Sequence, residues 1–293
     1  RGTQHAEGSG HPAGTHAVIP GHGGVASRIV RTVTALCALL PVYVLPTAGF
    51  AEPLSATASR YSIALIIDDL GNRRLPGDAV IDLPGPVACA FLPDGRHTPQ
   101  LARQAHARNK EVMLHLPMQA ASHGSAMPGE LRLDMSRRAF MATLQKSVEA
   151  VPHLSGINNH RGSLLTRHPG HMAWLMEFIR QRGSLFFVDS RTTAATVAQQ
   201  LAGEFGVPNI ERKVFLDNER DSQAIAAQFR RLLSIARREG TALGIGHPYP
   251  ETLALLRHEL VRLDEYNTEL VPVGRLIEIR NGGTPTWQAS LSR

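Results

Sequence analysis

Acidic and imidazole side chains recur in this sequence at the ends of short apolar runs. Asp68 and Asp69 follow YSIALII, His115 lies near the end of EVMLHL, and His247 follows TALGIG. Carboxylate and imidazole ligands without thiolates suit zinc or a similar divalent ion. Three such ligands with an open coordination position form a catalytic site, in which the ion activates water and polarises a carbonyl. A neighbouring carboxylate would act as the base and a histidine across the site as the acid. Similar positions are held by Asn158, Asn159, His160, Asp189, Ser190 and Asp217.

Each of these residues alone has a simpler interpretation. An aspartate after a strand is often a helix N-cap, and a single histidine there is often a hydrogen-bonded core residue. The joint pattern is harder to explain in that way. Burying several carboxylates and imidazoles together is costly unless an ion, or pairing among them, compensates for the lost hydration. The set of residues therefore favours a metal site.

The elements that would position these residues are read from hydrophobic periodicity. Continuous apolar runs are typical of parallel strands covered on both faces, and runs with a period of 3.6 are typical of amphipathic helices. Strands are predicted at 61–68, 87–91, 111–116, 156–160, 185–189, 213–217 and 241–247, with a weaker one at 270–273. Helices are predicted at 99–109, 136–151, 170–182, 192–205, 222–239 and 250–263.

The alternation of strands and helices predicts an α/β fold. Right-handed crossovers between parallel strands then give, most simply, a (β/α) barrel of seven or eight mostly parallel strands. A doubly wound open sheet is the alternative, because periodicity does not distinguish a closed sheet from an open one. In both architectures, sites are built at the carboxyl ends of the strands, so the polar residues above are expected to converge on one mouth.

Composition limits the classes of function. The chain has 293 residues, of which 43% are hydrophobic and 19% charged, so a folded core is expected. Two cysteines exclude a disulfide-stapled scaffold and a four-thiolate zinc site. The net charge of +6 raises the question of nucleic-acid binding. We expect no nucleic-acid partner, because the arginines near 230–238 share one predicted helix and no basic stretch is interleaved with aromatic residues.

The N-terminal region has the pattern of an export signal. Residues 1–27 are rich in Gly and His, and Arg28 and Arg31 precede a mostly apolar run at 32–46. Small residues at Gly49 and Ala51 fit cleavage after Ala51, which predicts an exported, periplasmic protein without a membrane span after cleavage. An uncleaved anchor is the alternative, but this run is shorter than the ~20 residues that cross a bilayer. The predicted organisation is an extension with signal peptide at 1–51, a linker at 52–60, one domain at 61–280 and a tail at 281–293.

Six short motifs carry a resemblance to a known family. They are IIDDLG (66–71), LHLPM (114–118), GINNHRGS (156–163), FFVDSRT (186–192), VFLDN (214–218) and GIGHP (244–248). In this order, each at a predicted strand end, they resemble the motif series of the divergent polysaccharide deacetylase family, which is related to NodB-type carbohydrate deacetylases. The resemblance implies an irregular (β/α) barrel and metal-dependent hydrolysis of an N-acetyl group on an amino sugar.

The resemblance also implies roles for individual residues. Asp68 resembles the general base, and Asp69 and His160 resemble metal ligands. His247 resembles the histidine that protonates the leaving amine. Asp189 resembles the carboxylate that orients a catalytic histidine.

One departure from the NodB-type pattern concerns the metal ligands. Those enzymes take two ligands from an HxxxH pattern, whereas the position four after His160 is Leu164. His115, from another strand end, is our candidate for the missing ligand. Arg161 stands where family members often carry Met, and it brings a positive charge that would bind an anionic substrate or face solvent. The residues expected to contact substrate are Asn158, Asn159, Arg161, Ser190 and Asp217.

The expected partner is an N-acetylated cell-envelope polysaccharide, and the expected cofactor is a divalent metal, with zinc as the leading candidate. The alternative is a catalytically degenerate glycan-binding or envelope-scaffold protein with the same fold.

Overall fold

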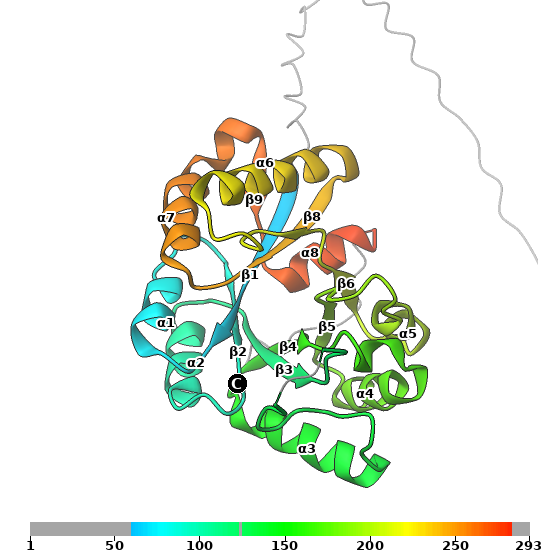
Figure 1. Cartoon of the computed structure of the whole chain (residues 1–293). Coiled ribbons are helices and arrows are strands. Elements are labelled where there is room, and N and C mark those ends of the chain that lie inside the picture. The colour runs from blue at the N-terminus through cyan, green and yellow to red at the C-terminus, as the bar shows by residue number, and fades with distance from the viewer. Residues whose placement is uncertain (1–59, 123–124, 283–293) are drawn as a thin grey trace, which may run out of the picture. The chain divides into compact units, whose positions relative to one another are not determined.

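A curled parallel sheet with helices on its outside organises the described part of the chain (Figure 1). The computed structural model describes residues 60–122 and 125–282. The predicted signal peptide and linker, up to residue 59, lie outside these residues, as does most of the predicted tail. The strands are β1 (Tyr61–Leu70), β2 (Ala88–Phe91), β3 (Val112–Met118), β4 (Leu154–Arg161), β5 (Phe186–Asp189), β6 (Asn209–Glu211), β7 (Val214–Phe215), β8 (Thr241–Gly246) and β9 (Thr268–Leu270).

The order of the strands shows how the sheet closes. It runs β6-β5-β4-β3-β2-β1-β8-β7, and β9 pairs with the beginning of β1. The two ends of this order, β6 and β7, follow one another in the chain. The Arg212 amide donates to the carbonyl of Asp189 beside β6, and the Lys213 amide donates to the carbonyl of Leu243 in β8. Segment 209–215 therefore joins both edges of the sheet, and the predicted (β/α) barrel of mostly parallel strands is confirmed.

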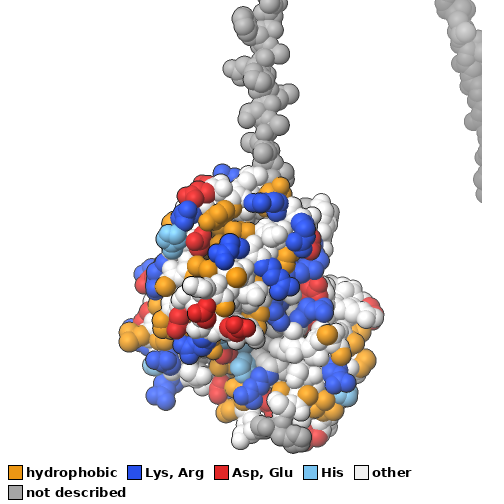
Figure 2. Space-filling view, turned by 45° about the horizontal axis from the view of Figure 1, so that its top comes forward, with side chains coloured by type: hydrophobic (Ala, Val, Ile, Leu, Met, Phe, Trp, Pro, Cys, Tyr) orange, Lys and Arg blue, Asp and Glu red, His pale blue; other side chains and the backbone are white. Residues whose placement is uncertain are grey.

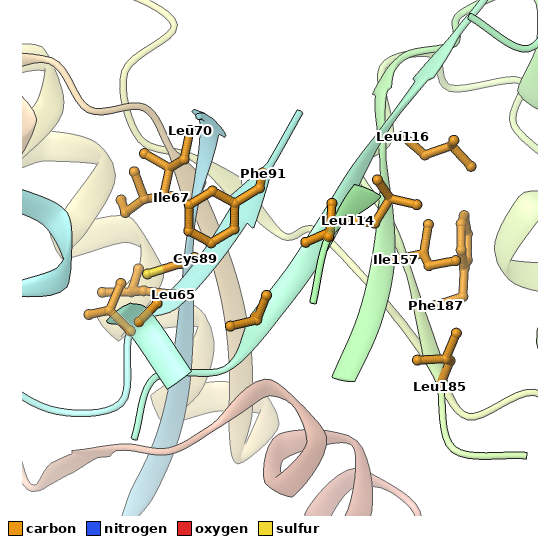
Figure 3. Packing of buried hydrophobic residues seen from close by; sticks show 14 of the residues in the cluster. Leu65, Ile67, Leu70, Cys89, Phe91, Leu114, Leu116, Ile157, Leu185 and Phe187 are labelled. Atoms are coloured by element: carbon orange, nitrogen blue, oxygen red, sulfur yellow. The ribbon is translucent and has the colours of Figure 1, made fainter. Parts of the chain in front are cut away.

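Side chains of each strand alternate between the inside of the barrel and the layer under the helices. In β1, Ala64 and Ile66 belong to the inner hydrophobic cluster, and Leu65 and Ile67 to the outer one. Figure 3 shows part of the outer cluster, in which Cys89, Leu114 and Phe187 also pack. The same alternation points Asp68, which follows Ile67, into the barrel.

The helices cover the outside of the sheet, with one exception. Figure 1 shows them around the strands, and α8 packs instead against the inner cluster through Val273, Leu276 and Ile277. No helix among residues 60–122 and 125–282 is both long and apolar enough to cross a membrane. The helices are α1 (Arg74–Ile81), α2 (Thr98–Ala107), α3 (Arg137–Ala150), α4 (Pro169–Arg182), α5 (Ala198–Glu204), α6 (Ser222–Glu239), α7 (Pro250–Glu259) and α8 (Val273–Arg280).

Helix ends follow local capping chemistry. Ser136 accepts a hydrogen bond from the amide of Ala139 before α3, and Asp221 accepts from two amides at the start of α6. Gly183 ends α4 in the left-handed conformation, with φ 67°. These three boundaries agree with the sequence predictions.

Three differences from the predicted elements have local causes. Helix α1 was not predicted, because Pro76 and Gly77 interrupt its pattern. Gly77 lies where a Cβ atom would come within 2.5 Å of the Leu101 side chain, so a larger residue there would make Leu101 shift. The predicted helix at 192–205 begins only at Ala198, and the predicted strand at 270–273 gives way to α8 at Val273.

Glu111 fixes α8 at the amino end of the barrel. Its carboxylate accepts hydrogen bonds from the amides of Val273 and Gly274, the first two residues of α8. A negative group is favourable there because these amides have no partner within the helix. Burial raises the pKa of Glu111 to about 7, although the two amide hydrogen bonds act in the opposite direction.

A pH-dependent stability contribution is expected from Glu111. Because its folded-state pKa lies above the ordinary value of 4.5, the contribution is complete below that pH and is lost as the pH rises through about 7. The unfolding free energy of the wild type, relative to Glu111→Gln, should therefore fall between about pH 5 and about pH 8. Urea unfolding measures it, with the exposed Glu149→Gln as control. A constant difference for Glu111→Gln would contradict the assignment.

Candidate metal centre

Asp69, His115 and His160 meet at the carboxyl ends of β1, β3 and β4. The Asp69 Oδ1 atom lies 3.0 Å from His160 Nδ1 and 3.4 Å from His115 Nε2, and the two ring nitrogens are 3.0 Å apart. Ligand atoms about 2.1 Å from a tetrahedral ion are separated by about 3.4 Å. The three atoms therefore fit around one ion.

The Asp69 oxygen at this point is buried without a hydrogen bond of good geometry. Two ring nitrogens surround it at short distance, so its surroundings resemble a set of ligands more than a hydrogen-bond network. Such an orphaned buried oxygen is costly unless a cation compensates. Burial would raise the pKa of Asp69, but the contacts with His115 and His160 lower it below its ordinary value, so the group is ionised and ready to bind a metal.

A local irregularity lets two consecutive aspartates serve one site. In a regular strand Asp68 and Asp69 would point to opposite faces of the sheet. The pairing of β1 with β2 changes register between Ile67 and Leu70, and Asp69 has a φ of 60°. A bulge of this kind re-aims side chains next to active sites. Both carboxylates consequently face the mouth of the barrel.

Asn158 determines which nitrogen of His115 is available to a metal. The Asn158 amide nitrogen donates to Asp68 Oδ1 at 2.8 Å, so its oxygen is the acceptor for His115 Nδ1 at 2.9 Å. With the proton on Nδ1, the neutral ring of His115 presents the lone pair of Nε2 toward Asp69 and His160. Asn158 was expected to contact substrate, but it is fully buried and holds Asp68 and His115 in place.

Asp68 is the buried carboxylate beside this cluster. Burial raises its pKa, while the charge of His115 and the hydrogen bond from Asn158 act in the opposite direction. Its Oδ2 atom lies 3.5 Å from His115 Nε2, and the residue lines a cavity at the barrel mouth. Asp68 is therefore placed to exchange a proton with a molecule in that cavity.

His247, after β8, faces the cluster from the opposite side and is held by Asp217. Its Nδ1 atom lies 2.9 Å from Asp217 Oδ1, and its Nε2 atom lies 3.8 Å from Asp69 Oδ2. Asp217 Oδ2 accepts from the His247 amide and from Thr252 Oγ1. Burial disfavours the protonated ring, but the contacts with Asp217 and the nearby aspartates outweigh it and raise the pKa of His247.

Two expected roles are corrected by this arrangement. Asp189, expected to orient a catalytic histidine, follows Val188, which points into the barrel, so its own side chain lies on the outer side. There it accepts from the amide of Arg191 and from Thr196 Oγ1, ahead of α5. Asp217, expected to contact substrate, is the carboxylate that orients a histidine, and its side chain is fully buried.

The remaining expected substrate contacts surround the cavity. Asn159, Arg161 and Ser190 line a volume of about 400 Å³, together with Asp68, His115, His160 and His247. The Asn159 side chain also ties two loops together, because it donates to the Arg161 carbonyl and accepts from the Ser190 amide. Sequence reasoning missed the other lining residues, which are Arg191, Thr192, Arg212, Phe215, Asn218 and Ile245. Most of them lie within or next to the six motifs, which was the available signal.

A second, smaller cavity also adjoins the cluster. It has a volume of about 240 Å³ and shares His247 with the first cavity. Asp69, Arg73 and Tyr249 are among its lining residues. Tyr249 is held from one side by Arg220, whose guanidinium carbon is 4.1 Å from the ring centroid. The residues of the candidate centre thus line two cavities that share His247.

Comparison with known proteins agrees with the fold and the motif order. Residues 65–277 match the family described as divergent polysaccharide deacetylase. The chain belongs to this family. The six motifs and the barrel mouth that they line all fall within the matched residues.

Two curated relatives are similar to this chain over about three quarters of its length. The uncharacterized protein YibQ of Escherichia coli (strain K12) is 36% identical over 210 residues, which are 72% of this chain and 66% of that protein. An uncharacterized protein of Haemophilus influenzae is 32% identical over 222 residues, 76% of this chain and 79% of that protein. The match with YibQ thus spans less than two thirds of that protein's length.

A solved structure shows the same fold. The crystal structure of an uncharacterized protein from Agrobacterium tumefaciens C58 has a TM-score of 0.71 with this chain at 22% sequence identity. The alignment covers 74% of this chain and 89% of the other.

Proposed function

We propose that this protein is a metal-dependent N-deacetylase that removes acetyl groups from amino sugars in a cell-envelope polysaccharide. The observation that carries the proposal is the convergence of Asp69, His115 and His160 between the buried carboxylate of Asp68 and the ring of His247. Membership of the divergent polysaccharide deacetylase family supports the substrate class. We also propose that the protein is exported to the periplasm, which detection of the chain in the periplasmic fraction tests.

The donor set suits zinc or a similar ion, held by one carboxylate and two imidazoles. When bound, such an ion polarises a carbonyl oxygen and lowers the pKa of a coordinated water. The protein supplies the rest of the chemistry. Asp68, kept in place by Asn158, accepts the proton of the attacking water.

His247 is placed to complete the reaction. Its Nδ1–H is held by Asp217, so its Nε2 points toward the cluster, from where a proton reaches the leaving amine. The raised pKa of His247 favours the protonated form that a general acid requires. The reacting amide would then lie between a base and an acid on opposite sides of the centre.

A second candidate function is glycan binding without turnover. The observation that favours it is the absence of the HxxxH pattern: Leu164 stands four residues after His160. The third ligand would come from His115 on a neighbouring strand. Metal content together with acetate release separates the two functions, because a binding protein would retain its glycan affinity and release no acetate.

Acetate release from N-acetylated oligosaccharides by the zinc-loaded protein tests the proposed function. We expect stoichiometric release of acetate and free amine. A zinc-loaded protein that releases no acetate from any of several N-acetylated glycans would contradict the proposal and support glycan binding.

Replacing Asp217 by Asn should reduce turnover without removing the metal. The amide would place the wrong partner on His247 Nδ1, which loses its preferred tautomer and orientation, so kcat should fall about 10²–10⁴-fold. Steady-state kinetics and elemental analysis measure the two effects. Asp189→Asn is the matched comparison, since it removes a buried strand-end carboxylate that does not hold His247. Equal losses in both variants would argue that Asp217 acts only through stability.

A further inference from the structure

The cavity beside the candidate centre is lined by three arginines whose charges are not equally neutralised. Arg191 forms an ion pair with Glu211, which also pairs with Lys213. Within residues 60–122 and 125–282, neither Arg161 nor Arg212 has a carboxylate oxygen within 4.0 Å. The wall of the cavity therefore carries two positive charges that form no ion pair among the described residues, although the carboxylates of Asp68 and Asp189 interact electrostatically with Arg212 over a longer distance.

Arg212 is fixed in the cavity wall by neutral groups. Its Nε donates to the Ser190 carbonyl at 2.6 Å, and its Nη2 donates to the Arg191 carbonyl at 2.9 Å. The guanidinium also lies over the ring of Phe215, 5.0 Å from its centroid. These contacts use one edge of the guanidinium, and in the described part of the chain no hydrogen bond uses Nη1. The partly buried cation consequently keeps free N–H groups beside the cavity.

Arg161 is held at the rim by its backbone. It ends β4 in the left-handed conformation, with φ 56°, which is unfavourable for a residue other than glycine. Its carbonyl accepts from Asn159 Nδ2 at 2.7 Å and from Thr192 Oγ1 at 2.8 Å. Backbone strain of this kind persists where the surroundings impose it, often at ligand sites. The Arg161 side chain is exposed, so it adds a solvent-accessible charge to the fixed charge of Arg212.

We propose that Arg161 and Arg212 bind an anionic group of the glycan, a carboxylate or a phosphate, next to the acetylated amine that reacts. This inference rests on the proposed function and narrows its substrate to acidic glycans. Partly buried cations are costly unless an anion compensates, and guanidinium groups suit carboxylate and phosphate oxygens. A neutral glycan would leave the partly buried charge of Arg212 without an ion-pair partner. Figure 2 shows that on the face in view Lys and Arg side chains are interspersed with Asp and Glu.

The test compares three substrates that differ in charge. They are an N-acetylglucosamine tetrasaccharide, the same tetrasaccharide with a phosphate monoester, and a tetrasaccharide that alternates N-acetylglucosamine with N-acetylmuramic acid, which carries a carboxylate. The zinc-loaded wild type should prefer one of the acidic substrates by at least about tenfold in kcat/KM. Which of the two is preferred identifies the anion.

The variants locate the preference. Arg161→Gln and Arg212→Gln should each lower the ratio of kcat/KM for the acidic substrate to kcat/KM for the neutral one about tenfold. Arg161→Glu, at an exposed position where folding is not at risk, should reverse the preference. Arg230→Gln on α6 removes one exposed positive charge outside the cavity and should change neither value. Equal losses on neutral and acidic substrates would overturn the proposal and place the arginines in the reaction itself.

Binding separates this inference from the proposed function. If no substrate releases acetate, calorimetry on the zinc-loaded protein with the same three oligosaccharides decides between them. Tighter binding of an acidic oligosaccharide, lost in Arg161→Gln, would support the anion site even though the deacetylase proposal had failed. Equal affinity for all three, or preference unaffected by both arginine substitutions, would overturn the anion site.

Discussion

Replacing Asp69 by Ala is expected to remove the metal and to abolish acetate release together. Asp69 is the single carboxylate among the three candidate ligands, and its Oδ1 lies within 3.4 Å of both histidine nitrogens. Without it, two neutral imidazoles would have to hold a divalent cation alone. Elemental analysis should find about one ion per wild-type chain and far less in the variant. Asp134→Ala, which removes an exposed carboxylate elsewhere, should keep full occupancy.

Replacing His115 by Ala is also expected to remove the metal, and this substitution tests the ligand that is particular to this chain. His115 is the proposed substitute for the ligand that HxxxH would supply, and Asn158 directs its Nε2 toward Asp69. We expect metal occupancy to fall as it does in Asp69→Ala and His160→Ala. A His115→Ala protein with full occupancy would show that His115 is a core residue. The proposed centre would then have two ligands from the protein, Asp69 and His160.

Replacing Asp68 by Asn should separate catalysis from metal binding. Asn has the same shape and its oxygen still accepts from Asn158, but its amide does not take a proton from water. Acetate release should therefore fall about 10²–10⁴-fold while metal occupancy stays at the wild-type value. Kinetics on the preferred oligosaccharide and elemental analysis of the same preparation measure both. A loss of less than about tenfold would contradict the role of Asp68 as base.

The positions of the strands and of most site residues were predictable because they depend on local patterns. The apolar runs ending at Asp68 and near His115 are each long enough to form a buried strand, and parallel strands bring their carboxyl ends together. The sequence left both a closed barrel and an open doubly wound sheet possible. Closure depends on segment 209–215, which pairs with β5 at one edge of the sheet and with β8 at the other.

The roles of Asp189 and Asp217 show where pattern reasoning stops. Both follow an apolar run and both are buried, so the sequence treats them alike. The two side chains differ because they lie on different faces of the sheet and because they contact different residues that are distant in the sequence. Asp189 continues the outward series of Phe187, whereas Asp217 reaches Thr252 and His247 across the end of β8. Residue type and spacing do not contain this information.

Contacts between segments that are distant in the sequence could also not be predicted from local patterns. The link between Glu111 and the start of α8 joins residues more than 160 positions apart, and α8 itself carries a weak sequence pattern. Whether an arginine of the cavity has a carboxylate partner also depends on contacts made in the folded chain. Arg191 and Arg212 look equivalent in the sequence, and only the position of Glu211 distinguishes the paired charge from the unpaired one.

Metal-dependent acetate release tests the central claim most directly. The purified protein would be stripped with a chelator and assayed on the neutral and acidic oligosaccharides, then assayed again after one equivalent of zinc is restored. We predict that acetate release disappears on stripping and returns with zinc, and that zinc restores no activity to Asp69→Ala. Acetate release that is unchanged by stripping, or its absence from every substrate while zinc is bound, would contradict the claim that Asp69, His115 and His160 form a catalytic metal centre.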